Sequence, residues 1–222
     1  MGAQSVKETY DAWSETYDQT ISQMAEVEEI VVKSLLRSLA FTDVLDAATG
    51  TGRYACYLAE NGKRVTAVDF SPRMLAEARK KAKERELPID FRCEDISGLS
   101  FADASFDLVI CALALAHVDD LKKPIKEFVR VLRSGGHLVI TDLHPQMQTE
   151  LGPGYQVDIA GKERFFPNYH MSVEEYLDTL AEVGANVVAA IDIPKLREGV
   201  EPGGLLVWAK KPEQGEEIVS IR

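Results

Sequence analysis

The sequence predicts an α/β domain with a doubly wound, mostly parallel sheet and helices on both of its faces. Five short segments are apolar and rich in β-branched residues, as buried strands are; they are residues 42–48, 64–69, 88–93, 106–112 and 136–143. Helical patterns lie between them, and an alternation of strand and helix implies a parallel sheet with right-handed crossovers. Ligands bind such sheets beyond the carboxyl ends of the strands.

Two core helices have clear sequence signals. Ser71 is a capping residue and Pro72 suits the first helical position; the apolar stripe that follows is Met74, Leu75, Ala78 and Ala82. A second helix is expected from about Leu121 to Leu132, closed by the glycine pair at 135–136.

The amino-terminal segment carries an apolar stripe with two interpretations. Val6, Tyr10, Trp13, Tyr17 and Ile21 step by four, three, four and four residues, so one helix face could carry all of them. The stripe could simply pack against the core. Alternatively, the segment could be a lid that closes over a ligand and excludes water.

The carboxyl-terminal third departs from the strand–helix rhythm. Residues 144–170 contain a candidate hairpin that turns at Ala160–Gly161. A capping box from Ser172 to Glu175 starts a helix that stops near Gly184. Two last strands, about 186–193 and 204–210, are expected to finish the sheet.

Composition narrows the class of function. The 222 residues have a formal net charge of -11, which opposes nucleic acid as a partner because such binding rests on a basic face. No window approaches the roughly 18 apolar residues that span a bilayer, so a cytoplasmic location without membrane insertion is expected. Cys56, Cys93 and Cys111 lie in apolar stretches and are expected to be buried structural thiols.

A glycine bend follows the first strand. Residues 50–55 (GTGRYA) fit the GxGxxA dinucleotide pattern, with Asp69 about twenty residues on, although a packed turn without a ligand gives the same letters. Carboxylates recur at strand ends as Asp46, Asp69 and Asp95. A carboxylate suits ribose hydroxyls or an ammonium group and repels pyrophosphate. These residues favour an adenosine ligand that is not a polyphosphate.

Longer motifs resemble the class I S-adenosylmethionine-dependent methyltransferases, in the branch that methylates small molecules and quinones. The motifs are VLDAATGTG, VTAVDFSPRMLAEAR, CEDISGLSFADASFDLVICALALAHV and FVRVLRSGGHLVITDLHP. They follow one another in order over roughly residues 10–143. The resemblance implies a Rossmann-like seven-stranded sheet, S-adenosylmethionine as cofactor, S-adenosylhomocysteine as product, and in-line methyl transfer to a small molecule.

The resemblance also implies a division of the single domain, 1–222. We expect a helical lid (1–40), a cofactor-binding core (41–143), a substrate-side insert (144–170), a carboxyl-terminal helix with edge strands (171–211) and a tail (212–222). The aromatic residues of the insert suggest an acceptor with an apolar or aromatic body. A homodimer is one state compatible with the sequence.

The resemblance assigns cofactor contacts residue by residue. Gly50 and Gly52 would lie under the methionine part, Asp46 at its ammonium group and Asp69 at the ribose. The remaining contacts would be Tyr17 near the carboxylate, Phe70 and Met74 beside the adenine, Asp95 and Ile96 at its edge, and the backbone at Cys111 and Ala112 in the amino-acid pocket. The family usually has glycine where this chain has Ala48, and we expect the extra methyl to require a negative φ.

Histidines are the candidate bases, because a base near a hydroxyl, amine or thiol acceptor assists methyl transfer. His144 is preferred because it follows the fifth strand on the ligand side; His117 and His170 are the other candidates. The histidine spacing does not suit a metal site, so none is expected. Two rival functions remain: a nicotinamide-dependent oxidoreductase, and a protein that binds S-adenosylmethionine without turnover.

Overall fold

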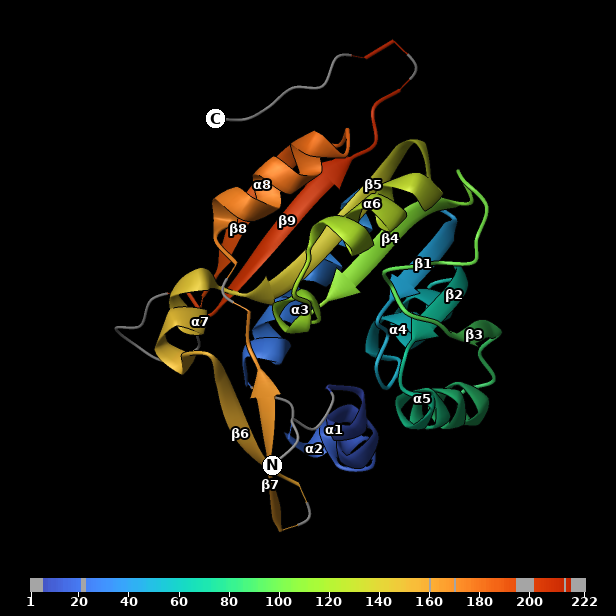
Figure 1. Ribbon diagram of the computed structural model, residues 1–222. Coiled ribbons are helices and arrows are strands. Elements are labelled where there is room, and N and C mark those ends of the chain that lie inside the picture. Colours follow the sequence, from blue (N-terminus) through green and yellow to red (C-terminus); the bar gives the residue numbers. More distant parts are fainter. Residues whose placement is uncertain are drawn as a thin grey trace.

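Seven strands form a single sheet in the order β3-β2-β1-β4-β5-β9-β8 (Figure 1). The structure is a computed structural model, and it describes residues 6–20, 23–159, 161–169, 171–194, 202–213 and 215–216. The strands are β1 (Asp43–Ala47), β2 (Arg64–Asp69), β3 (Ile89–Cys93), β4 (Phe106–Ala112), β5 (Leu132–Leu143), β8 (Asn186–Ile193) and β9 (Gly204–Lys210). The pairings from β3 to β5 are parallel, and β9 is antiparallel to both of its neighbours. The predicted doubly wound, mostly parallel sheet is confirmed.

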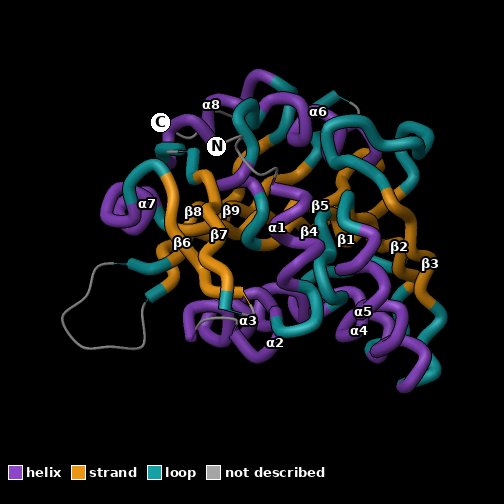
Figure 2. The backbone as a smooth tube through the Cα atoms, turned by 60° about the horizontal axis from the view of Figure 1, so that its bottom comes forward, coloured by secondary structure: helices purple, strands orange, loops and turns teal. Residues whose placement is uncertain are grey.

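Helices cover both faces of the sheet, as Figure 2 shows. α3 (Gln23–Ser38), α4 (Arg53–Glu60) and α5 (Pro72–Glu84) lie on one face, and α6 (Lys122–Val131) and α8 (Val173–Glu182) lie on the other. One apolar cluster joins α3 and α4 to the strands through Leu36 and Leu58, and another joins α6 and α8 to them through Phe128 and Leu180. Burial on both faces explains why the central strands are nearly continuous apolar runs.

The predicted capping signals are found where α5 and α8 begin. The hydroxyl of Ser71 accepts a hydrogen bond from the Met74 amide at 3.1 Å, and Pro72 begins α5. Ser172 and Glu175 form the reciprocal capping box of α8. β5 begins earlier than expected, because Leu132 is already extended (φ -70°, ψ 140°) and pairs with Phe106.

The segment after β5 contains one element that the sequence analysis missed. α7 (Pro145–Leu151) starts directly after β5, with His144 as its cap and proline at its first position. β6 (Gly154–Ile159) and β7 (Lys162–Pro167) form the expected hairpin as a separate two-stranded sheet. Ala160, where the turn was expected, lies outside the described residues.

The amino-terminal segment is two short helices, so the prediction that one helix face carries the whole aromatic stripe is wrong. α1 (Val6–Trp13) ends in a turn, in which the Thr16 amide bonds to the Trp13 carbonyl, and α2 (Tyr17–Thr20) follows. The Ser14 hydroxyl also bonds to the Asp11 carbonyl, a local bond that competes with helix continuation. Ile21 lies outside the described residues.

α1, α2 and the β6–β7 hairpin lie beyond the carboxyl ends of β1 and β4 (Figure 1). Trp13 and Phe166 pack with their rings 5.3 Å apart in an apolar cluster between α1 and the hairpin. Cys56 and Cys111 are buried, whereas Cys93 is exposed at the end of an edge strand, contrary to prediction. Among the described residues, no helix has the length and apolar character that a membrane span requires.

Candidate functional site

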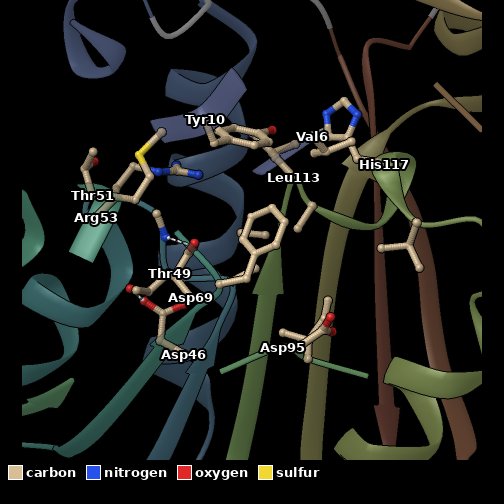
Figure 3. Close-up of a pocket in the computed structure, with 18 of the residues that line it drawn as sticks. Val6, Tyr10, Asp46, Thr49, Thr51, Arg53, Asp69, Asp95, Leu113 and His117 are labelled. Atoms are coloured by element: carbon tan, nitrogen blue, oxygen red, sulfur yellow. Dashed lines mark hydrogen bonds between the residues drawn. The ribbon is translucent and has the colours of Figure 1, made fainter. Parts of the chain in front are cut away.

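A cavity of about 360 Å³ opens beyond the carboxyl ends of β1, β2 and β4, where a doubly wound sheet is expected to bind a ligand (Figure 3). Its floor is the glycine bend, and α1 and α2 contribute part of its wall. The residues that were predicted to contact a cofactor and that line the cavity are Tyr17, Asp46, Ala48, Gly50, Asp69, Phe70, Met74, Asp95, Ile96 and Ala112.

Two residues of the predicted set lie elsewhere. Gly52 has φ +83°, and a Cβ there would approach the Ala78 Cβ to 3.0 Å, so this glycine allows α4 and α5 to pack closely. It does not line the cavity. Cys111 is completely buried in the cluster beneath α6 and α8, and burial raises the pKa of its thiol. Neither residue is among those that line the cavity.

Ala48 adopts a left-handed conformation, with φ +59°. The expectation of a negative φ at this position is therefore wrong. The turn from β1 into the bend sets the conformation: the Thr49 amide donates to the Val68 carbonyl at 2.9 Å, and the Gly52 amide donates to the Thr49 carbonyl at 2.9 Å. A left-handed alanine costs roughly 1–2 kcal/mol. Strain of this size is stored at the edge of the cavity.

Two buried carboxylates face the bend. Asp69 accepts the Gly50 amide and the Ser71 amide, each at 2.8 Å, through its two oxygens. Asp46 accepts the Thr49 hydroxyl at 2.6 Å. Burial raises the pKa of each carboxyl to about 6. Both groups are oriented by the bend, and both are acids that a cation or a hydroxyl donor in the cavity would stabilise as carboxylates.

Arg53 and Glu28 form an ion pair that sequence reasoning missed. Nη1 of Arg53 lies 2.6 Å from Oε2 of Glu28, and the guanidinium stacks 4.4 Å above the Tyr54 ring. In Figure 3 the guanidinium points into the cavity. The available signals were an arginine directly after the second glycine of the bend and a glutamate on an apolar helix face; nothing in the sequence links them.

The amino-terminal segment, residues 6–20, is tied to the two helices that begin at the cavity. Asp18 accepts the Thr51 hydroxyl at 2.7 Å and pairs with the ammonium group of Lys81. Asp11 accepts the Ser71 hydroxyl at 2.5 Å. These contacts hold Tyr10 and Tyr17 against the cavity.

His117 faces the cavity and has a defined tautomer. Its Nδ1 lies 2.7 Å from the Pro167 carbonyl oxygen, which can only accept, so Nδ1 carries the proton and Nε2 keeps its lone pair. Burial lowers the pKa of this imidazole. The Tyr10 ring lies edge-on to it at 5.9 Å, and Figure 3 shows both on the same side of the cavity. The site therefore offers a neutral hydrogen-bond acceptor.

The structure does not bring the preferred histidine to the cavity. His144 caps α7 by accepting the Gln146 amide at Nδ1, and its Nε2 lies 3.3 Å from Asp192. It is not among the lining residues. His170 lies outside the described residues.

Comparison with known proteins is consistent with this architecture. Residues 45–140 match the family model described as a methyltransferase domain. A demethylmenaquinone methyltransferase of Thermus thermophilus is 40% identical over 116 residues, which are 51% of this chain and 53% of that protein. A ubiquinone/menaquinone biosynthesis C-methyltransferase of Bdellovibrio bacteriovorus is 41% identical over 101 residues, covering 45% of this chain and 43% of that protein. The chain thus spans about half the length of these curated relatives.

A solved S-adenosylmethionine-dependent methyltransferase of Clostridium acetobutylicum superposes with a TM-score of 0.72 at 21% identity, over 90% of this chain and 96% of that one. This likeness extends beyond residues 45–140 and shows that the fold is shared across almost the whole chain. The nicotinamide-dependent alternative gains no support from these comparisons.

Proposed function

We propose that the chain is a class I S-adenosylmethionine-dependent methyltransferase and that it transfers the cofactor's methyl group to a small-molecule acceptor by in-line displacement. The observation that carries the proposal is the pair of buried carboxylates, Asp46 and Asp69, held by the glycine bend at the end of the parallel strands. Asp69 would suit the ribose of a dinucleotide as well, but the pyrophosphate would then lie at the bend beside Asp46, and the nicotinamide alternative is therefore disfavoured.

The donor set of the cavity fits this cofactor. Asp69 would accept the ribose hydroxyls, and Asp46 would meet the ammonium group. Arg53 would bind the α-carboxylate, since its guanidinium is fixed from behind by Glu28. The adenine would be flanked by Phe70, Met74 and Ile96. Its amino group would donate a hydrogen bond to Asp95. When bound, the cofactor supplies a methyl group on a positively charged sulfur.

The amino-terminal segment, residues 6–20, which is part of the expected lid, and the insert would enclose the reacting groups. Tyr10 and Tyr17 line the cavity from the lid, and Tyr169 lines it from the insert. Such a wall would exclude water and align the acceptor, and alignment can contribute roughly 7–11 kcal/mol to a displacement. On removal of residues 1–20, the loss in the free energy of cofactor binding should therefore exceed the loss in the free energy of unfolding.

His117 is the group we assign to the acceptor side. A neutral Nε2 can take the proton of an acceptor hydroxyl as the bond to the methyl group forms, which adds about 10² to 10⁴-fold. The relatives named above carry quinone-type acceptors in their names, and the aromatic rings of Tyr10 and Tyr169 suit a flat apolar body. We therefore propose a hydroquinone-type aromatic acceptor.

Calorimetric titration with S-adenosylhomocysteine, beside NADH, tests the cofactor. We expect stoichiometric binding of the former alone; binding of NADH alone, or of neither, would contradict the proposal. Transfer of a labelled methyl group to 1,4-naphthohydroquinone then tests turnover. Tight cofactor binding without transfer to a broad acceptor panel would favour the non-catalytic alternative.

His117→Gln should lower turnover about 10²-fold or more. His144→Asn is the matched control, because asparagine can still cap α7, and turnover should stay within about twofold. The opposite result in the two variants would restore His144 as the base.

A further inference from the structure

Asp142 is a buried carboxylate that does not touch the cavity. It lies near the end of β5 with 1% of its surface exposed, and it is not a lining residue. Its Oδ2 accepts the Ala116 amide at 2.6 Å and the Tyr176 hydroxyl at 2.9 Å, and its Oδ1 accepts the Leu143 amide at 2.8 Å. Burying such a group is unfavourable unless its oxygens are satisfied, and here three donors satisfy them.

The Ala116 amide belongs to the short 3-10 turn that carries His117. That turn, Leu115–His117, follows β4 and precedes α6. The same peptide segment is held on its other side, because the Tyr169 amide donates to the Ala116 carbonyl at 2.8 Å. Asp142 therefore fixes the backbone one residue before His117, while the insert fixes it from the opposite direction.

Tautomer and orientation of His117 depend on this placement. The bond from Nδ1 to the Pro167 carbonyl is 2.7 Å long, and it survives only if the turn and the end of β7 keep their spacing. Burial raises the pKa of the Asp142 carboxyl to about 6, so it is ionised at neutral pH and its bond to the Ala116 amide is charge-assisted. Asparagine could not replace it, because any orientation of the amide turns an NH2 group towards one of the N–H donors.

The geometry points to Asp142 as a positioning residue that holds His117 in the Nδ1–H tautomer with Nε2 open to the cavity. This inference rests on the proposed function only in so far as Nε2 of His117 serves the acceptor. The positioning itself is a property of the protein without any ligand.

Imidazole nitrogen resonances of the full chain, labelled with ¹⁵N and assigned with His117→Gln, provide the test. The wild type should show His117 with a protonated Nδ1 and an unprotonated Nε2. His137 is an internal reference of the opposite tautomer, because its Nδ1 accepts the Trp208 indole N–H at 3.1 Å.

In Asp142→Asn, His117 should shift to a mixture of tautomers while His137 stays unchanged. Tyr176→Phe keeps the carboxylate and removes one donor, so it should shift His117 in the same direction by less. Asp107→Asn is the matched control: this carboxylate also accepts two backbone amides, those of Thr42 and Asp43 at 2.9 Å, but beside the starts of β1 and β4. It should leave His117 as in the wild type.

Wild-type His117 resonances in both Asp142→Asn and Tyr176→Phe would overturn the inference, as would an equal change at His137, which would indicate general loosening. Should Asp142→Asn not fold, the Tyr176→Phe spectrum alone decides. With 1,4-naphthohydroquinone as acceptor, Asp142→Asn should lower kcat about 10- to 100-fold with the dissociation constant of S-adenosylhomocysteine changed less than about twofold. If His117→Gln left turnover intact while Asp142→Asn still altered the tautomer, the proposed role of His117 would fail and the positioning would stand.

Discussion

Glu28 holds Arg53 beneath the cavity: the carboxylate is completely buried in α3, and its Oε2 lies 2.6 Å from Nη1 of the guanidinium. The other oxygen of Glu28 accepts the Thr141 hydroxyl at 2.6 Å, which ties the pair to β5. Nη1 also donates to the Ala25 carbonyl at 3.2 Å. Nη1 of the guanidinium is thus hydrogen-bonded within the protein, and the side of the group that faces the cavity is pre-organised for a carboxylate.

We predict that Arg53→Met weakens binding of S-adenosylhomocysteine by about 10- to 100-fold, the range expected for loss of a hydrogen-bonded charge pair worth about 1.5–3 kcal/mol. Binding of 5′-methylthioadenosine, which has no amino-acid part, should change less than about twofold. Calorimetry with both ligands measures the difference.

Arg53→Lys should lose less affinity than Arg53→Met, because the positive charge remains but the two-pronged geometry does not. An equal loss for both ligands in Arg53→Met would show that the substitution damages the cavity as a whole, and the assignment of Arg53 to the carboxylate would be wrong.

The strain at Ala48 predicts a stabilising substitution. Its φ of +59° suits glycine, so Ala48→Gly should raise the free energy of unfolding by about 1 kcal/mol. Urea denaturation measures this value. Ala59→Gly, within α4, is the opposite control and should lower stability by about 1 kcal/mol. A loss of stability in Ala48→Gly would mean that the alanine methyl contributes packing that outweighs the backbone strain.

Most of the sheet could be predicted because its strands are buried on both faces. Residues 43–47 and 106–112 are buried along most of their length, and their apolar residues mark them as strands. The order of the last two strands could not be predicted in this way. β9 lies between β5 and β8, and the choice of neighbour depends on packing across the sheet that no local pattern records.

The candidate site was predictable where residues follow strand ends. Asp46 and Asp69 converge because the carboxyl ends of parallel strands meet at one edge. A position after a strand was not enough to place His144 at the cavity. His144 also follows a strand, but Pro145 starts α7 at once and the imidazole caps that helix. The break after Trp13 was hidden because the aromatic spacing alone allowed a longer helix.

The contacts of Asp18 predict that the amino-terminal segment, residues 6–20, which we propose as part of a lid, controls cofactor exchange. Asp18→Asn keeps the side-chain size but loses the charge paired with Lys81. We expect faster dissociation of S-adenosylhomocysteine, by severalfold for a partly exposed pair worth up to about 1 kcal/mol. Stopped-flow fluorescence of Trp13 reports the event, in a Trp208→Phe background that removes the other tryptophan.

Lys122→Met is the control, because its pair with Glu182 is also exposed to solvent but joins α6 to α8. It should leave the dissociation rate unchanged. Added salt should speed dissociation from the wild type and have little effect on Asp18→Asn. Identical rates in Asp18→Asn and the wild type would remove the lid contact as a determinant of exchange.

Acid should weaken cofactor binding while it stabilises the free protein, because Asp46 and Asp69 both have a pKa raised to about 6 by burial. Between the unfolded pKa of about 4 and pH 6, the folded chain binds more protons than the unfolded chain, so these groups make the free energy of unfolding rise as pH falls through 6. Bound S-adenosylhomocysteine needs the ionised forms, so its affinity should fall over the same window.

The slope of the affinity with pH identifies the carboxyls. As the pH falls below 6, the logarithm of the S-adenosylhomocysteine dissociation constant should rise by up to about two for each pH unit. Each of the two acids that must lose a proton contributes about one. 5′-Methylthioadenosine has ribose hydroxyls but no ammonium group, so it engages Asp69 alone and its slope should approach about one. Asp69→Asn should remove that slope. Equal slopes for the two ligands would show that Asp46 does not meet the ammonium group, and calorimetry between pH 5 and 8 distinguishes these outcomes.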